Sequence, residues 1–158
     1  MSTEVGSTAP DFTLPDQDRQ PVTLSAQRGT NVVLAFFPAA FTGVCTKELC
    51  TFRDTLAQLN EANAVVFGIS ADTPFALKEF ATQQRLNFPL LSDFNRTAIE
   101  GYDVANPDMG GLKGIAKRAV FVIDGTGVIR HKEITPNPGI EPNYAQVHTA
   151  LATLGVRS

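Results

Sequence analysis

The sequence contains few cysteines, no tryptophan and no long apolar run. Its 158 residues include 2 cysteines and 11 phenylalanines. Two cysteines cannot build a disulfide framework, and a chain of this length buries roughly two thirds of its unfolded surface, which is enough for an ordinary core. No stretch approaches the roughly 18 apolar residues that a membrane-spanning helix needs. We therefore expect residues 1–158 to form a single globular domain without a membrane partner.

No stretch of the sequence concentrates charges of one sign. The formal net charge is -3, and no run of lysine or arginine stands out. Such a run would be needed to attract nucleic acid or an anionic lipid surface, so we expect neither partner. The opening residues MSTEVGSTAPDF lack the basic start and apolar core of a signal peptide. This predicts a cytoplasmic protein, in which free cysteines are often catalytic, metal-binding or buried.

The sequence also lacks the usual binding motifs for cofactors. It has no glycine-rich phosphate loop and no GxGxxG pattern, which makes a nucleotide cofactor unexpected. Cys45 and Cys50 are five residues apart, unlike the CxxC spacing of zinc sites, and no second pair of ligands is near them. We expect neither a metal nor a bound cofactor.

Hydrophobic patterning predicts strands and helices that alternate along the chain. Apolar runs predict strands at 31–37, 64–70 and 88–91, a hairpin from 119–124 and 128–134, and a small hairpin within 11–24. Three- and four-residue spacing predicts helices at 43–60, 73–84 and 142–154. This order indicates an α/β fold with a mixed central sheet, helices on both of its faces and an N-terminal β-hairpin.

Cys45 follows the segment PAAFTGV, which leaves a predicted buried strand and enters a predicted helix. If Thr42 is the N-cap, Cys45 occupies the third helical position, close to unpaired backbone N–H groups. These donors and the helix dipole stabilise negative charge, so we expect a thiolate. The Thr42 hydroxyl is near enough in sequence to donate to the sulfur or to an oxygen of a bound peroxide.

A thiolate at this position needs a positive partner from elsewhere, because no charged residue occurs from Gly29 to Thr46. Arg118 directly precedes the predicted strand AVFVID. Strand ends gather at the ligand site of open α/β sheets, and arginine keeps its charge under all conditions. We therefore predict that Arg118 lies beside Cys45.

Neighbouring residues allow two interpretations each. Glu48 either orients an arginine or is a first-turn acid that stabilises the helix dipole. Phe37, Phe41 and Pro38 either line a substrate pocket or pack in the core, with the core favoured for Phe37. His131 and His148 are interpreted as ordinary surface or helix residues. Their positions in the sequence do not indicate a cluster with either cysteine.

The stretch FFPAAFTGVCTKELC resembles the active-site signature of the peroxiredoxin family, through Pro38, Thr42 and Cys45. The family's arginine corresponds to Arg118, and the opening APDFTL resembles the family's N-terminal hairpin. The likeness covers nearly the whole chain. It implies a thioredoxin-like fold and a thiol peroxidase that reduces hydrogen peroxide and organic hydroperoxides. It also implies that Cys45 is oxidised to a sulfenic acid.

Features of two peroxiredoxin subgroups are present. Cys50 matches the resolving position of the bacterioferritin-comigratory, or Q, type, whereas FPAAFTGVC and FPLLSDF resemble the alkyl hydroperoxide reductase E type. The first likeness implies a disulfide between Cys45 and Cys50 that thioredoxin reduces. The second implies one reactive cysteine resolved by an external thiol, such as a glutaredoxin-like one, with Cys50 a packed helix residue. We expect the protein to be a monomer or a homodimer.

The spacing of the cysteines makes a further prediction. Helical residues five apart are separated by about 7.5 Å along the axis and point about 140° apart. A disulfide needs Cα atoms within about 7 Å and converging side chains. A bond between Cys45 and Cys50 therefore requires the helix to unwind locally, and the reduced protein should show an intact helix with separate thiols.

Two other functions fit the same fold. A thioredoxin-like disulfide oxidoreductase would exchange disulfides with proteins, but the sequence has no CxxC motif. A binding module with a structural cysteine would show no peroxidase activity.

Overall fold

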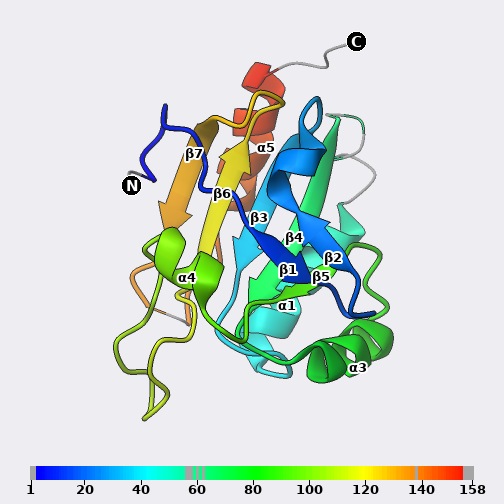
Figure 1. Ribbon diagram of the computed structural model, residues 1–158, viewed down its shortest axis with the longest axis vertical. Coiled ribbons are helices and arrows are strands. Elements are labelled where there is room, and N and C mark those ends of the chain that lie inside the picture. The colour runs from blue at the N-terminus through cyan, green and yellow to red at the C-terminus, as the bar shows by residue number, and fades with distance from the viewer. Residues whose placement is uncertain (1–2, 56–58, 60, 62, 138, 155–158) are drawn as a thin grey trace.

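A five-stranded mixed sheet forms the centre of the computed structural model (Figure 1). The residues described are 3–55, 59, 61, 63–137 and 139–154. The strand order is β5-β4-β3-β6-β7, with β3, β4 and β5 parallel and β6 antiparallel to both of its neighbours. The strands are β3 (Asn31–Phe36), β4 (Ala64–Ser70), β5 (Leu90–Ser92), β6 (Ala119–Ile123) and β7 (Ile129–Ile134). The mixed sheet expected from the sequence is confirmed.

Strand β3 is buried along its whole length because both faces of the sheet are covered. Its side chains alternate between two apolar clusters, with Val32, Leu34 and Phe36 in one and Val33 and Ala35 in the other. A strand covered on both faces needs apolar side chains at every position, which explains the unbroken run in its sequence.

Among the described residues, three helices cover one face of the sheet and contribute Leu49, Leu77 and Val147 to the same cluster as Val33. The other face is covered by a small hairpin and two short helices, which contribute Leu14, Leu24 and Ile99. In Figure 1, α1 and α5 lie behind the sheet and the hairpin lies in front of it. The three helices are α1 (Gly43–Asp54), α3 (Pro74–Gln84) and α5 (Tyr144–Leu154). The elements on the other face are β1 (Thr13–Pro15), β2 (Pro21–Thr23), the 3₁₀ helix η1 (Leu24–Gln27) and α4 (Thr97–Gly101).

Several element boundaries differ from those that the pattern predicts. The strand predicted at 88–91 begins two residues later, at Leu90, and ends at Ser92. The carbonyl of Pro89 accepts the N–H of Gly68, but pairing in register with β4 starts only at Leu90. Helix α1 ends at Asp54 instead of 60, although residues 56–58 and 60 of the predicted helix lie outside the described ones. Helix α5 begins at Tyr144, where the Asn143 side chain accepts a hydrogen bond from the N–H of Gln146.

The start of α3 agrees with the sequence. Thr73 is the N-cap, and its hydroxyl accepts a hydrogen bond from the N–H of Ala76 at 3.3 Å. Pro74 takes the first helical position, where its missing N–H is not needed.

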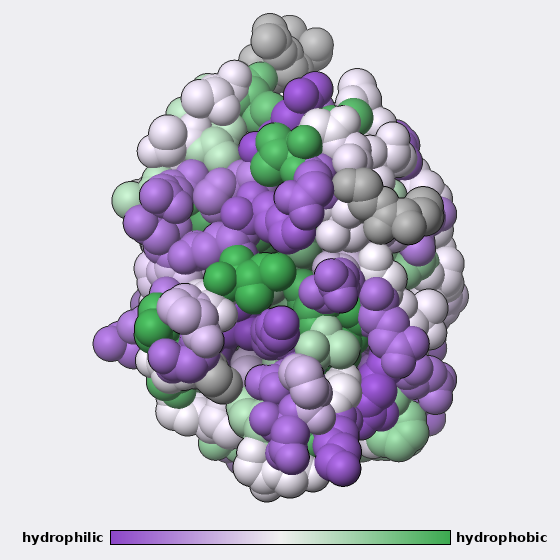
Figure 2. Space-filling model, turned by 90° about the vertical axis from the view of Figure 1, so that its left-hand side faces the viewer, coloured by the Kyte–Doolittle hydropathy of each residue, from purple (hydrophilic) through white to green (hydrophobic). Residues whose placement is uncertain are grey.

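Strand β7 forms one edge of the sheet. The face on this side is mainly hydrophilic, with hydrophobic side chains in small separate groups (Figure 2). Arg130, Lys132 and Glu133 place charges along the strand, and such charges discourage edge-to-edge pairing with another sheet. None of the helices in the described part of the chain is long and apolar enough to cross a membrane.

Candidate active site

The loop before α1 is fixed by the end of β4. The N–H of Phe37 donates to the carbonyl of Ile69 at 3.0 Å, which extends the parallel pairing one residue past β3. Asp72 then accepts two hydrogen bonds on one carboxylate oxygen, from the N–H of Ala40 at 2.8 Å and from the hydroxyl of Ser70 at 2.7 Å. The chain between β3 and α1 is therefore held to the neighbouring strand, and Pro38 is buried within it.

Cys45 occupies the third residue of α1, as predicted, because the helix begins at Gly43 after the extended N-cap Thr42. The Thr42 hydroxyl donates to the carbonyl of Ala39 at 2.9 Å. A hydroxyl has one proton, so it cannot donate to the Cys45 sulfur in the same conformation. The expected bond from Thr42 to the sulfur is thus not made in this state.

Cys45 and Arg118 lie in contact, although they are far apart in sequence. The Cys45 side chain is fully buried, and its Sγ accepts a hydrogen bond from Nη2 of Arg118 at 3.2 Å. Arg118 directly precedes β6 and is only 2% exposed. The pairing of β6 with β3 brings this residue to the end of the sheet where the chain leaves β3 for α1. The predicted neighbourhood of the two residues is therefore observed.

The other side of the Arg118 guanidinium binds Glu48. Nη1 of Arg118 lies 2.6 Å from Oε1 of Glu48, which is fully buried. Glu48 is beyond the first turn of α1, so its interpretation as a first-turn acid is wrong. A single guanidinium thus contacts both a carboxyl group and the sulfur through its two terminal nitrogens.

Burial and neighbouring charges shift the pKa values of Glu48 and Arg118. Burial raises the pKa of Glu48 to about 8, and the attraction of Arg118 only partly opposes the shift. Burial works to lower the pKa of Arg118, but the neighbouring Glu48 and Cys45 outweigh it and raise that pKa. Arg118 therefore stays cationic in the interior of the protein.

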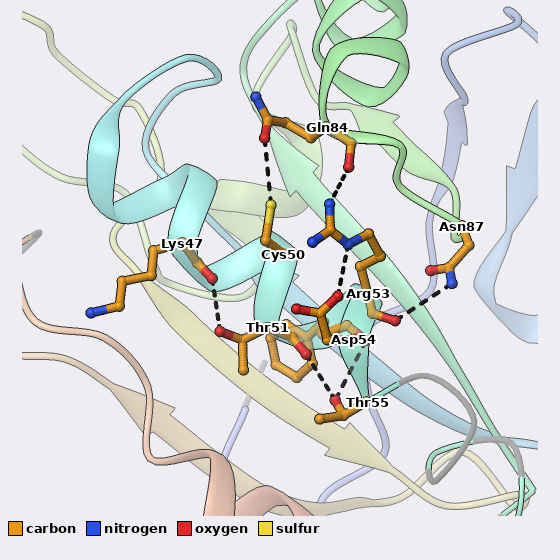
Figure 3. A network of polar contacts seen from close by, with 9 residues as sticks. Lys47, Cys50, Thr51, Arg53, Asp54, Thr55, Gln84 and Asn87 are labelled. Carbon is orange, nitrogen blue, oxygen red and sulfur yellow. Dashed lines mark hydrogen bonds and ion pairs between the residues drawn. The ribbon is translucent and has the colours of Figure 1, made fainter.

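Cys50 lies in the middle of α1 and is half-buried. Its Sγ donates to Oε1 of Gln84, the last residue of α3, at 3.5 Å, and Figure 3 shows the two side chains pointing toward each other. Nη1 of Arg53 donates to the main-chain carbonyl of the same Gln84 at 2.5 Å. Both cysteines are free thiols, and α1 is continuous from Gly43 to Asp54, as predicted for the reduced protein.

The remaining candidates divide between core and surface. Phe37 is buried against Phe80, with ring centroids 6.3 Å apart, which agrees with the core interpretation. Phe41 is 51% exposed and has a φ of 67°, and its ring packs edge-on against Phe80. His148 lies in α5. His131 is not an ordinary surface residue, because its Nε2 is buried without a hydrogen-bond partner in the described part of the protein and burial lowers its pKa.

Pattern reasoning missed Asp72 and Gln84. Asp72 follows the predicted strand 64–70, and parallel strands end at the same edge of a sheet, so its position next to the Cys45 loop could have been inferred. Gln84 carried no comparable signal. Within the ranges that the structure describes, no group of three or more His, Cys, Asp or Glu side chains could hold a metal ion.

Comparison with known proteins agrees with this geometry. The model of the AhpC/TSA family matches residues 5–132. Alkyl hydroperoxide reductase E of Mycobacterium tuberculosis is 46% identical over 153 residues, which is 95% of this chain and 97% of that protein. The putative peroxiredoxin bcp of Coxiella burnetii is 41% identical over 150 residues, 93% of this chain and 97% of that one. The crystal structure of peroxidoxin BcpB from Mycobacterium tuberculosis has a TM-score of 0.83 at 37% identity, covering 98% of this chain and 99% of that chain.

A buried cysteine at a strand-to-helix junction, bound to an arginine, together with these relatives defines a thiol-dependent peroxidase of thioredoxin-like fold. The chain belongs to the AhpC/TSA family. Both subgroups that the sequence resembles, the alkyl hydroperoxide reductase E type and the Q type, occur among its relatives.

Proposed function

We propose that Cys45 is the thiolate that attacks the peroxide. The carrying observation is the hydrogen bond from Nη2 of Arg118 to the buried Sγ at 3.2 Å, at the start of a helix. The sulfur attacks the terminal oxygen of R–O–OH, the O–O bond breaks, and Cys45 becomes a sulfenic acid while an alkoxide or hydroxide leaves. Arg118 stabilises the charge that moves from sulfur to the leaving oxygen.

We assign supporting roles to Thr42 and Pro38. Rotation of the Thr42 hydroxyl away from Ala39 would let it donate to a bound peroxide, and its main chain defines the start of α1. Pro38 is buried in the loop before α1. The role we assign to it is to shield the sulfur from water. The proposed substrates are hydrogen peroxide and organic hydroperoxides, reduced without a metal or other cofactor.

The thiol count after one equivalent of hydrogen peroxide tests the assignment. In a Cys50→Ser protein, we expect the rapid loss of one thiol per chain and the formation of a sulfenic acid that a dimedone probe traps. A Cys45→Ser protein is the matched control and should retain its remaining thiol. If both variants lost a thiol equally fast, or if neither lost one, Cys45 would be ruled out as the peroxidatic residue.

We propose that Cys50 resolves the sulfenic acid. Its thiol attacks the Cys45 sulfur, water leaves, and an intramolecular disulfide forms after the first turns of α1 have unwound. Thioredoxin is then the expected reductant. The engagement of Cys50 with Gln84 favours a second candidate, in which an external thiol, such as a glutaredoxin-like one, resolves Cys45.

Mass spectrometry of the intact protein after one equivalent of peroxide distinguishes the two routes. Loss of two hydrogens, reversed by a dithiol and absent in Cys50→Ser, supports the disulfide. A persistent gain of one oxygen in the parent protein supports the external thiol. Insulin reduction in parallel tests the rival disulfide oxidoreductase, and activity there without peroxide consumption would contradict the peroxidase.

We further propose that residues 1–158 act as one domain, as a monomer or homodimer, in the cytoplasm. Two free cysteines suit a reducing compartment, where a reductant can regenerate them. In this setting the enzyme would have an antioxidant role.

A further inference from the structure

At the buried N-terminal part of α1, two acidic groups, Cys45 and Glu48, both contact the guanidinium of Arg118, which lies just before β6. Cys45 and Glu48 are three residues apart, on the same face of the helix, and both are fully buried. Arg118 contacts both, at 3.2 Å to the sulfur and 2.6 Å to the carboxyl oxygen. If both acids were ionised, this interior would carry two negative charges against a single positive one.

The other charged groups that act on Glu48 do not restore the balance. Glu133 of β7 and Glu141 of the segment before α5 both raise its pKa. The ammonium of Lys47, on its own helix, is 3.2 Å from Oε2 of Glu141 and is mostly exposed. Tyr144 of α5 donates its hydroxyl proton to Oε1 of Glu141 at 2.7 Å. The surroundings of Glu48 thus add negative charge.

The second oxygen of Glu48 gives an independent geometric sign. Its Oε2 is buried and has no hydrogen-bond partner in the part of the chain that the structure describes. A buried carboxylate oxygen without a donor is costly, and buried carboxyl groups in such positions hold a proton instead. Arg118 can neutralise only one of its two neighbours, and the geometry favours the proton on Glu48 when the sulfur is ionised.

We propose that Cys45 and Glu48 share one proton, that Arg118 compensates whichever of them is ionised, and that Glu48 releases this proton when Cys45 is oxidised. The proposal rests on the proposed function of Cys45 and names the source of the proton that the leaving oxygen takes up. Glu48 acts through Arg118 and is a positioning residue that also stores a proton.

The reaction balances with these groups. The thiolate of Cys45 and R–O–OH give a sulfenic acid and an alkoxide. The alkoxide takes up one proton to become an alcohol, and Glu48 loses one to become a carboxylate. Arg118 is paired with sulfur before the reaction and with Glu48 after it, so the buried site stays neutral throughout. When a dithiol later returns Cys45 to a thiol, the proton passes back to Glu48.

Counting protons during oxidation tests the proposal. Peroxide is added to the Cys50→Ser protein near neutral pH, in weak buffer with a pH indicator, and proton uptake is compared with the amount of Cys45 oxidised. We expect no net uptake, because Glu48 supplies the proton. The same protein with Glu48→Gln should take up one proton per Cys45 oxidised. Glu79→Gln, which removes an exposed acid of α3, should behave like the Cys50→Ser protein.

Uptake of one proton per oxidised Cys45 by the Cys50→Ser protein overturns the proposal, because Glu48 then supplies none. No uptake by the Glu48→Gln variant also overturns it, because Cys45 then supplies its own proton. Failure of Cys45 to react with peroxide would instead contradict the proposed function.

A second measurement does not depend on the folding of a Glu48 variant. Infrared difference spectra of the Cys50→Ser protein, before and after oxidation, should show the loss of one protonated-carboxyl band. An unchanged carboxyl region alongside normal peroxide consumption would refute proton storage while leaving the peroxidase intact.

Discussion

Replacing Arg118 with lysine tests the electrostatic core of the site. The guanidinium reaches the Cys45 sulfur at 3.2 Å and the Glu48 oxygen at 2.6 Å with different nitrogens. A lysine ammonium is a compact charge and cannot hold the same two-sided geometry. Because the contact with Glu48 is the shorter one, we expect the lysine to keep it and to lose the sulfur. The Arg118→Lys protein should therefore fold, but peroxide should oxidise its Cys45 slowly.

The expected slowing follows from the lost hydrogen bond. A hydrogen bond to a charged group contributes about 1.5–3 kcal/mol. If the bond acts in the transition state, the rate falls roughly 10- to 150-fold. Arg118→Met loses both contacts and should be slowed by about 10² to 10³, as when an oxyanion donor is removed.

Stopped-flow oxidation by hydrogen peroxide under single-turnover conditions measures this rate. A Cys50→Ser background restricts the signal to the first chemical step. Arg130→Lys is a matched control, because this surface arginine pairs with Asp124 at 2.7 Å and should leave the rate unchanged. If folded Arg118→Met reacted within about twofold of the parent, Arg118 would not stabilise the transition state.

Three further perturbations address the loop, the second cysteine and the surface. Asp72→Ala removes the acceptor of the Ala40 N–H, which should cost about 1–3 kcal/mol in urea unfolding and slow peroxide oxidation, whereas equal stability would show that the loop does not need it. Gln84→Leu frees the Cys50 thiol and should speed disulfide formation about 2- to 10-fold in quenched mass spectrometry, and an unchanged or slower rate would contradict a restraining role. Burial works to raise the pKa of Asp124, but its hydrogen bonds outweigh burial and lower the pKa from 3.8 to about 2. Its ionised form therefore stabilises the fold above the higher value, and this contribution is lost as the pH falls through the lower one. After allowance for solvent screening, Asp124→Asn should abolish about 1 kcal/mol of acid-dependent stability in chemical unfolding, and an unchanged acid profile would refute that assignment.

The parts of the fold that the sequence predicts are those in which one periodicity dominates. Strand β4 coincides with the predicted 64–70, and β3 with all but the last residue of 31–37, because a doubly covered strand requires an unbroken apolar run. Helix α4 spans only five residues, too short for a 3.6-residue pattern. It is fixed by the buried Asp93, whose carboxylate accepts the N–H groups of Ala98 and Ile99. Such a contact is not visible as periodicity.

The site shows the same limit. The proximity of Cys45 and Arg118 follows from where strands end, which the order of elements already indicates. The partner of Glu48 could not be decided, because helical spacing gives the face on which a side chain lies and not what it meets across the interface. The contact between Cys50 and Gln84 depends on how closely α1 packs against α3, and no local pattern encodes that distance.

The bond from Arg53 to the Gln84 carbonyl makes the two ends of α1 unequal. The C-terminal end of α1 is bound to the neighbouring helix α3. The N-terminal end is held through Cys45 itself and through the loop before it. If the cysteines join, Cys45 must therefore move toward Cys50, and its sulfur leaves the guanidinium of Arg118. Away from Arg118, the sulfur would no longer react readily with a second peroxide. Disulfide formation would therefore also protect Cys45 from irreversible oxidation by the enzyme's own substrate.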